Sequence, residues 1–169
     1  MRQAISLLKN EAGGIVIIAA IMILALLTII GIASLSTSNI EVRIAGQESI
    51  YQQNFYNAEG ATLETVELLE NTSNPKTAGL SWLELNVDGV TADDILDKSF
   101  WQSGNGTVTP QQSAALADTQ LMAVSEGAVT GTSLAMGSTK VHAYTIYGRA
   151  APPNRGETII QIGYLKAFK

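Results

Sequence analysis

The side chains that most often carry out chemistry are sparse in this 169-residue chain. His142 is the only histidine and cysteine is absent, which excludes disulfides, thiol nucleophiles and metal sites built from several cysteines or histidines. No Gly-x-Ser-x-Gly motif supports a Ser-His-Asp arrangement, and the glycines at 104 and 106 match no phosphate-binding loop. His142 falls in a stretch typical of a strand, so we expect it to pack or to face solvent.

A group of four aspartates within ten positions is the remaining candidate for a metal site. Its members are Asp88, Asp93, Asp94 and Asp97. Their spacing lacks the EF-hand pattern, and no glutamate stands at the twelfth position of such a loop. We expect these acids instead to begin a short capped helix, where they face the positive end of its dipole. The sequence therefore predicts no catalytic residue, no metal, no cofactor and no enzymatic activity.

Charge is low overall and unevenly distributed. The net charge is −5 and the pI about 4.8, which argues against nucleic-acid binding. Only 15% of residues are charged, against about 25% in a typical soluble domain. Residues 12–40 are 29 consecutive uncharged positions, whereas residues 59–97 hold nine acids against Lys76. The acidic stretch predicts either an exposed acidic face or a docking surface for a basic partner.

Residues 15–35 have the length and composition of a membrane-spanning helix. They include thirteen Ile, Leu or Val residues among 21. As a helix rising about 1.5 Å per residue, the segment is roughly 31 Å long, which matches the hydrocarbon core of a bilayer. At about −0.3 to −0.6 kcal/mol for each such residue, insertion is favoured by roughly 4 to 8 kcal/mol. The alternative, a secretory signal peptide, would have an apolar run of only about 7 to 15 residues.

The charges that flank this segment predict its orientation. Before it, Arg2 and Lys9 outweigh Glu11, and the first charges after it sum to −1. The positive-inside tendency then puts the N-terminus in the cytoplasm and the rest of the chain across the membrane.

The helix is expected to continue beyond the apolar run, over residues 15–70. No proline occurs there, and apolar residues recur at spacings of three, four and seven, which indicates one helical face. That face comprises Ile40, Ile44, Tyr51, Phe55, Ala58, Thr62 or Leu63, Val66 and Leu69. The first half of the helix is therefore apolar all round and the second half amphipathic, and the turn at residues 71–75 ends it.

Residues 71–169 are expected to form a globular head. The sequence predicts strands over residues 121–126, 140–150 and 157–168, and the last two form a hairpin around the turn at residues 151–156. The polar tract 103–118 is expected to be a loop. Trp82, Phe100 and Trp101 are expected to lie in the core.

Four blocks of the N-terminal third form a pattern. They are Gly14 after the basic leader, Ile-Ile-Gly-Ile at 29–32, Ile-Glu-Val-Arg-Ile-Ala-Gly at 40–46, and Ala58-Glu59. Their order and spacing resemble the N-terminal region of PilX-like minor pilins of type IV pili, preceded by a class III prepilin leader. The resemblance covers residues 13–62.

The resemblance implies a pilin-like α+β fold, in which a small antiparallel sheet in the head lies across the long N-terminal helix. Its expected parts are a leader (1–14), a helix (15–70, with 15–35 spanning the membrane) and a head (71–169). A prepilin peptidase would cut between Gly14 and Ile15, with Gly13 as the competing site. The mature chain would have 155 residues and, without Arg2, Lys9 and Glu11, a charge of −6; pilin-type methylation is also expected.

The same resemblance implies partners and a place of action. The partners are major and minor pilin subunits, the prepilin peptidase, inner-membrane lipid and the pilus assembly machinery. The chain would span the inner membrane once, with its head in the periplasm, and then enter a pilus at the cell surface. Small side chains would let neighbouring helices approach in the filament core, and they belong to Ala19, Ala20, Ala25, Gly31 and Ala33. The polar positions of the family motif are Glu41, Arg43 and Glu59.

One position departs from the family pattern. Most pilins have a glutamate at the fifth mature position, which is thought to pair with the N-terminal amine of a neighbouring subunit, and Ala19 stands there in this chain. A carboxylate at that depth costs about 2 to 3 kcal/mol or more in lipid, so it is normally functional. Its absence favours a minor subunit at the filament tip or in an initiation complex. The alternative explanation for Ala19 is drift to a hydrophobic residue. For the whole chain, the alternative functions are a minor pseudopilin of a type II secretion system and an unprocessed membrane-anchored periplasmic sensor or binding domain.

Overall fold

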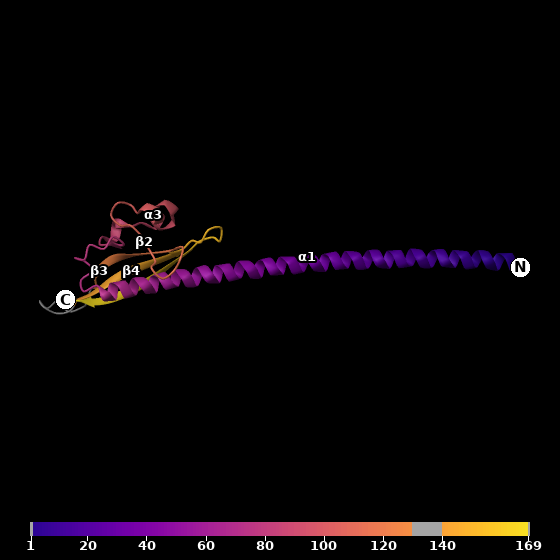
Figure 1. Ribbon diagram of the computed structural model, residues 1–169, viewed down its shortest axis with the longest axis horizontal. Coiled ribbons are helices and arrows are strands. Elements are labelled where there is room, and N and C mark those ends of the chain that lie inside the picture. The colour runs from indigo at the N-terminus through magenta and orange to yellow at the C-terminus, as the bar shows by residue number, and fades with distance from the viewer. Residues whose placement is uncertain (1, 130–139, 169) are drawn as a thin grey trace. The chain divides into compact units, whose positions relative to one another are not determined.

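The computed structural model describes the backbone of residues 2–129 and 140–168, and the side chains of residues 14–129 and 140–167. Its elements are α1 (Arg2–Asn71), β1 (Leu83–Glu84), the 3-10 helix η1 (Val87–Gly89), α2 (Ala92–Leu96), α3 (Lys98–Ser103), β2 (Gln111–Gln112), β3 (Thr119–Ala128), β4 (Lys140–Ala150) and β5 (Thr158–Phe168) (Figure 1). The chain divides into two compact units, Met1–Glu48 and Ser49–Lys169, and α1 contributes residues to both.

The second unit is built on a mostly antiparallel sheet with the order β1-β3-β4-β5. β3, β4 and β5 form an antiparallel meander in which Ile146 pairs with Ala123 on one side and Ile162 on the other. β1 is parallel to β3, and β2 pairs with β3 further along. The three strands predicted from the sequence and their hairpin are thus confirmed, and β3 is longer than expected.

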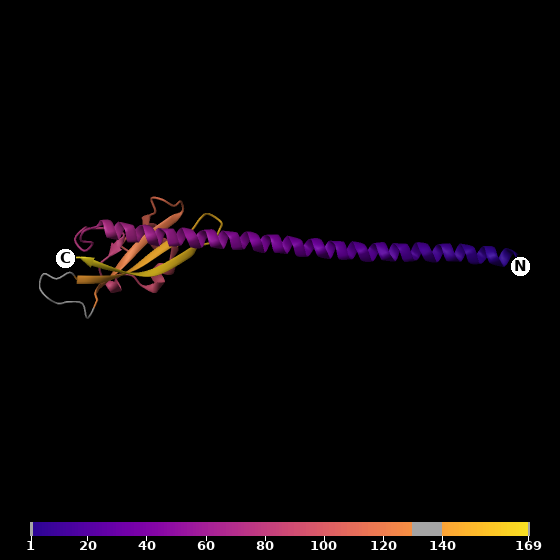
Figure 2. The same ribbon diagram turned by 90° about the horizontal axis from the view of Figure 1, so that it is seen from below.

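The sheet of the second unit lies between two helical layers. The part of α1 that belongs to this unit crosses one face, and α2 and α3 cover the other (Figures 1 and 2). Side chains alternate along β3, so Leu121 and Ala123 belong to the core on the α1 side, while Met122 and Val124 pack with α2 and α3. The α+β, pilin-like fold class, with a long N-terminal helix packed on a small sheet, is therefore confirmed.

The tryptophans and Phe100 lie in these cores, as predicted. Trp82 belongs to the α1 side, whereas Phe100 and Trp101 belong to the other side. There the Arg149 guanidinium lies 5.7 Å from the Trp101 ring centroid and forms an ion pair of 2.8 Å with Glu157. This contact ties α3 to the sheet.

The face that α1 buries differs from the predicted one. Ala58, Thr62 and Leu69 are buried as expected, but Tyr51 and Phe55 are exposed. The buried side chains are Asn54, Ala58, Ala61, Thr62, Thr65 and Leu69. This stripe is richer in small residues because the helix packs closely on the sheet, and a close contact excludes large rings.

The short elements differ in detail from the sequence prediction. The expected helix is split at Asp97, which ends α2 and caps α3 by accepting the Ser99 N–H at 2.9 Å. Asp94 closes the capping box with Thr91, and these hydrogen bonds lower its pKa; bonds with Ser99 likewise lower the pKa of Asp97. The tract 103–118, expected to be a loop, contains the short strand β2.

Candidate functional site

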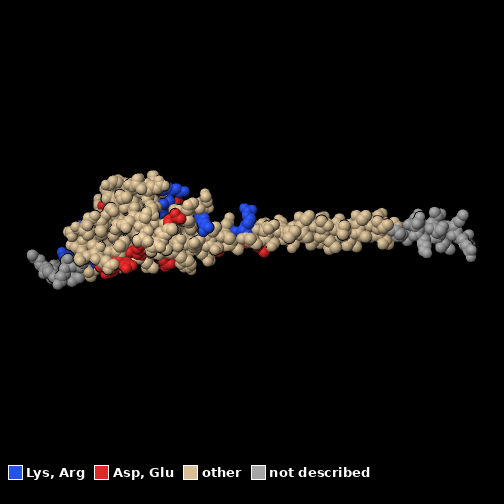
Figure 3. Space-filling view, viewed as in Figure 1, with Lys and Arg blue, Asp and Glu red and all other residues tan. Residues whose placement is uncertain are grey.

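The most extensive candidate surface is the apolar part of α1 in the first unit. Its large apolar side chains between positions 15 and 35 are each 58 to 68% exposed. Figure 3 shows this stretch of helix as a surface without charged side chains. Within the described residues, α1 from Gly14 onward includes one stretch long and apolar enough to cross a membrane. Such a surface is costly in water, so it calls for lipid or protein around it.

The residues predicted for cleavage and helix packing all lie exposed on this helix. They are Gly14, Ile15, Ala19, Ala20, Ala25, Gly31 and Ala33. At about 100° per residue, Ala20 and Gly31 lie within about 20° of each other, Ala19 and Ala33 within about 40°, and Ala25 on a third side. The small residues are thus spread around the helix, which allows close approach on several sides. The leader side chains, including Gly13, lie outside the described residues.

The three polar positions of the family motif are also exposed on α1. Glu41 and Arg43 belong to the first unit, and Glu59 to the second. Glu59 lies next to Ala58, which is fully buried against the sheet, so the Ala-Glu pair straddles the border between buried and exposed faces. The structure does not bring these polar residues together into one cluster.

Gly148 of β4 lies in close contact with α1. A Cβ built at this position would lie 2.2 Å from the Ala58 carbonyl oxygen and 2.8 Å from Thr62 Cγ2. No side chain other than hydrogen fits there, so glycine allows the small stripe of α1 to rest directly on the strand.

Two charged side chains form hydrogen bonds that hold parts of the head together: Lys166 binds the end of α1, and Glu64 binds a loop. Lys166 of β5 is 6% exposed, and its Nζ donates to the carbonyls of Leu69, Glu70 (3.1 Å) and Thr72 (2.7 Å). A cation at this end of a helix satisfies free carbonyls and complements the dipole. Glu64 accepts the Ala114 N–H at 2.8 Å and a bond from the Ser113 hydroxyl, so it fixes the loop before β3.

His142 lies on β4, as predicted, and is 5% exposed. Burial, followed by the charges of Lys76 and Lys140, lowers its pKa below the ordinary value. Among the described residues, no group of three or more His, Cys, Asp or Glu side chains is arranged to hold a metal ion. The four aspartates act instead in η1, α2 and α3, or in the turns beside them.

Sequence reasoning missed Lys166, Gly148 and Glu64, which join α1 to the head. One signal was visible: Lys166 interrupts the apolar end of a strand, and such a charge usually has a structural partner. The other two depend on which residues of distant elements meet, and no local pattern carries that information.

Comparison with known proteins finds a match in the N-terminal region of the chain. The family model described as PilX N-terminal matches residues 12–62, which includes the apolar part of α1 and its first contacts with the sheet. No curated protein and no solved structure gives a significant match. Residues 12–62 are therefore similar to the N-terminal region of PilX-like type IV pilins, in agreement with the sequence resemblance.

Proposed function

We propose that this chain is a structural, non-enzymatic minor subunit of a type IV pilus that takes part in pilus assembly or initiation. The observation that carries the proposal is the apolar surface of residues 15–35, because it lies within the segment that matches the PilX N-terminal family. Insertion of that segment into a bilayer is favoured by roughly 4 to 8 kcal/mol, so the segment resides in the inner membrane before assembly. Packing among neighbouring helices gives it a second apolar environment afterwards.

Processing by a prepilin peptidase is part of this proposal. Cleavage between Gly14 and Ile15 removes the basic leader and makes Ile15 the new N-terminus. The mature chain then begins with an apolar stretch without charge until Glu41, apart from its terminal amine. That amine is the single cation available at the start of the packed helix.

Ala19 supports a minor and terminal role. A shaft subunit that pairs its fifth mature residue with a neighbour's amine needs a carboxylate, and a methyl group cannot accept a proton or a hydrogen bond. A subunit at the tip or in an initiation complex does not require that contact with a preceding subunit. The alanine also avoids the cost of a carboxylate in lipid.

The test is the N-terminal sequence of the protein recovered from sheared filaments. We expect Ile15 as the first residue, and we expect Gly14→Leu to leave the leader attached, while Gly13→Leu is still cut. The proposal is contradicted if the wild-type protein retains Met1, or if the protein is absent from the filaments. Loss of enzyme secretion with intact pili, on deletion of the gene, would indicate a type II secretion pseudopilin instead.

A further inference from the structure

The edge of the sheet at β1 is open to another strand. The Trp82 carbonyl accepts a hydrogen bond from the Ala123 N–H at 2.9 Å, so the Trp82 carbonyl points toward β3. Because backbone groups of successive residues point to opposite sides of a strand, the backbone polar groups of Leu83 and Leu85 point away from β3. The Leu83 N–H donates to the Leu80 carbonyl at 3.2 Å, which leaves the Leu83 carbonyl and the Leu85 N–H at the outer edge. The Thr109 N–H occupies that edge at the Ser81 carbonyl, at 2.8 Å. From the Leu83 carbonyl onward, no described residue continues the ladder.

A buried carboxylate without a counter-charge lies at this edge. Glu84 is 7% exposed, its Oε1 accepts the Asn86 N–H at 2.9 Å, and its Oε2 has no hydrogen-bond partner among the described residues. It takes part in no ion pair within that part of the chain. A buried carboxylate with an unused oxygen is unfavourable unless a cation or donor completes it.

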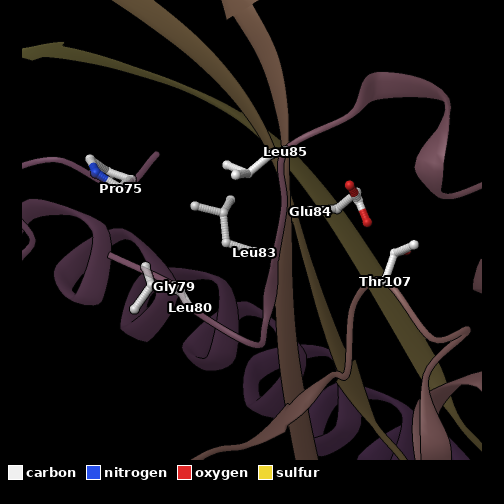
Figure 4. Close-up of a pocket in the computed structure, with 7 residues that line it drawn as sticks. All are labelled: Pro75, Gly79, Leu80, Leu83, Glu84, Leu85 and Thr107. Carbon is white, nitrogen blue, oxygen red and sulfur yellow. The ribbon is translucent and has the colours of Figure 1, made fainter. Parts of the chain in front are cut away.

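The open edge also forms a pocket of about 220 Å³ with two chemically different sides. Figure 4 shows the Glu84 carboxylate on the same side of the strand as Thr107, while Leu83 and Leu85 point to the other side, toward Pro75. Leu85 is 51% exposed, so the apolar side is incompletely covered. Side chains of an added strand would alternate between these two sides.

We propose that the outer edge of β1 binds an extended segment of a partner protein in which basic and apolar residues alternate. The backbone of this segment hydrogen-bonds the Leu83 carbonyl and the Leu85 N–H, in the manner of β-strand addition. A lysine or arginine side chain approaches the Glu84 carboxylate from the pocket, and the next side chain packs on the exposed Leu85. Residues 59–97, with nine acids against one lysine, attract such a segment over a longer range.

The test is fluorescence anisotropy of a labelled Val-Arg-Val-Arg-Val peptide, titrated with the full chain in neutral detergent. The main variant is Glu84→Gln, which keeps the shape and removes the charge. Its control is Asp88→Asn, which removes the same charge from an exposed side chain four residues away. A peptide with the same composition in the order Val-Val-Val-Arg-Arg tests the alternation.

We expect Glu84→Gln to weaken binding of the alternating peptide about tenfold, and Asp88→Asn to change it less than twofold. Gly89→Ala gives an independent check, since its Cβ would lie 2.6 Å from Glu84 Cδ and displace the carboxylate without changing the charge; we expect weaker binding. The proposal is overturned if Glu84→Gln binds as well as the wild type, if both peptides bind equally, or if calcium chloride alone competes for the site. These results do not depend on the role of residues 15–35, so failure here leaves the pilin proposal standing.

Discussion

Adding one methyl group at Gly148 should push α1 away from the sheet. The new Cβ would lie 2.2 Å from the Ala58 carbonyl oxygen, a backbone atom that cannot rotate away, and 2.8 Å from Thr62 Cγ2. Reaching ordinary contact distance requires a shift of more than about 1 Å, which loosens the whole buried stripe from Asn54 to Leu69. Overpacking of this kind typically costs 1–3 kcal/mol, and we expect the upper end, about 3 kcal/mol, because backbone must move.

The assay is thermal unfolding of the full chain in detergent, followed by tryptophan fluorescence. Both tryptophans, Trp82 and Trp101, lie in the second unit, so the signal reports on the packing of the head. At about 3–6 °C for each kcal/mol, Gly148→Ala should lower Tm by about 9–18 °C. The control is Gly163→Ala on β5, where a Cβ meets no atom within 4 Å. If the two variants unfold within about 2 °C of each other, the close contact between α1 and β4 is refuted.

Three further predictions concern other parts of the chain. Lys166→Met should lower the free energy of unfolding of the head, measured in urea, by about 2–4 kcal/mol, because hydrogen bonds from a charged group to the carbonyls at the end of α1 are lost. The control, Lys98→Met at an exposed position, should change that free energy by less than about 0.5 kcal/mol. The lowered pKa of His142 means that the unfolded chain binds its proton more readily, so stability falls as pH drops below about 6.5. His142→Asn should flatten that slope between pH 7 and 5, as urea midpoints would reveal. Ala19→Glu supplies the missing carboxylate and should raise the number of subunits per sheared filament above that of Ala19→Gln, measured by quantitative immunoblot; equal numbers would count against the role assigned to Ala19.

The sequence predicted β4 and β5 well because their information is local. Alternating aromatic and branched residues on either side of a turn containing Pro152 and Pro153 specify a hairpin without reference to the rest of the chain. β1 and β2 have two residues each and exist because they pair with β3. No pattern within two residues predicts such pairing.

The buried face of α1 and the burial of Glu84 at the edge of β1 show a second limit of prediction from sequence. Hydrophobic periodicity favoured Tyr51 and Phe55 for the interface, but the depth available at Gly148 selects small residues such as Ala58 and Ala61. Glu84 is one of nine acids over residues 59–97, and in the sequence nothing distinguishes this buried side chain from the other eight. Such features depend on the distance between elements, which composition and spacing do not encode.

The central claim, that residues 15–35 pack against other pilin subunits in a filament, is tested most directly by photo-cross-linking. A photoreactive amino acid in place of Ala25, which is exposed on α1, would be introduced in the full chain and activated in sheared filaments and in membranes. We predict a covalent adduct with another pilin subunit in the filament fraction. Adducts with lipid alone in both fractions, or no protein in the filaments, would contradict the account.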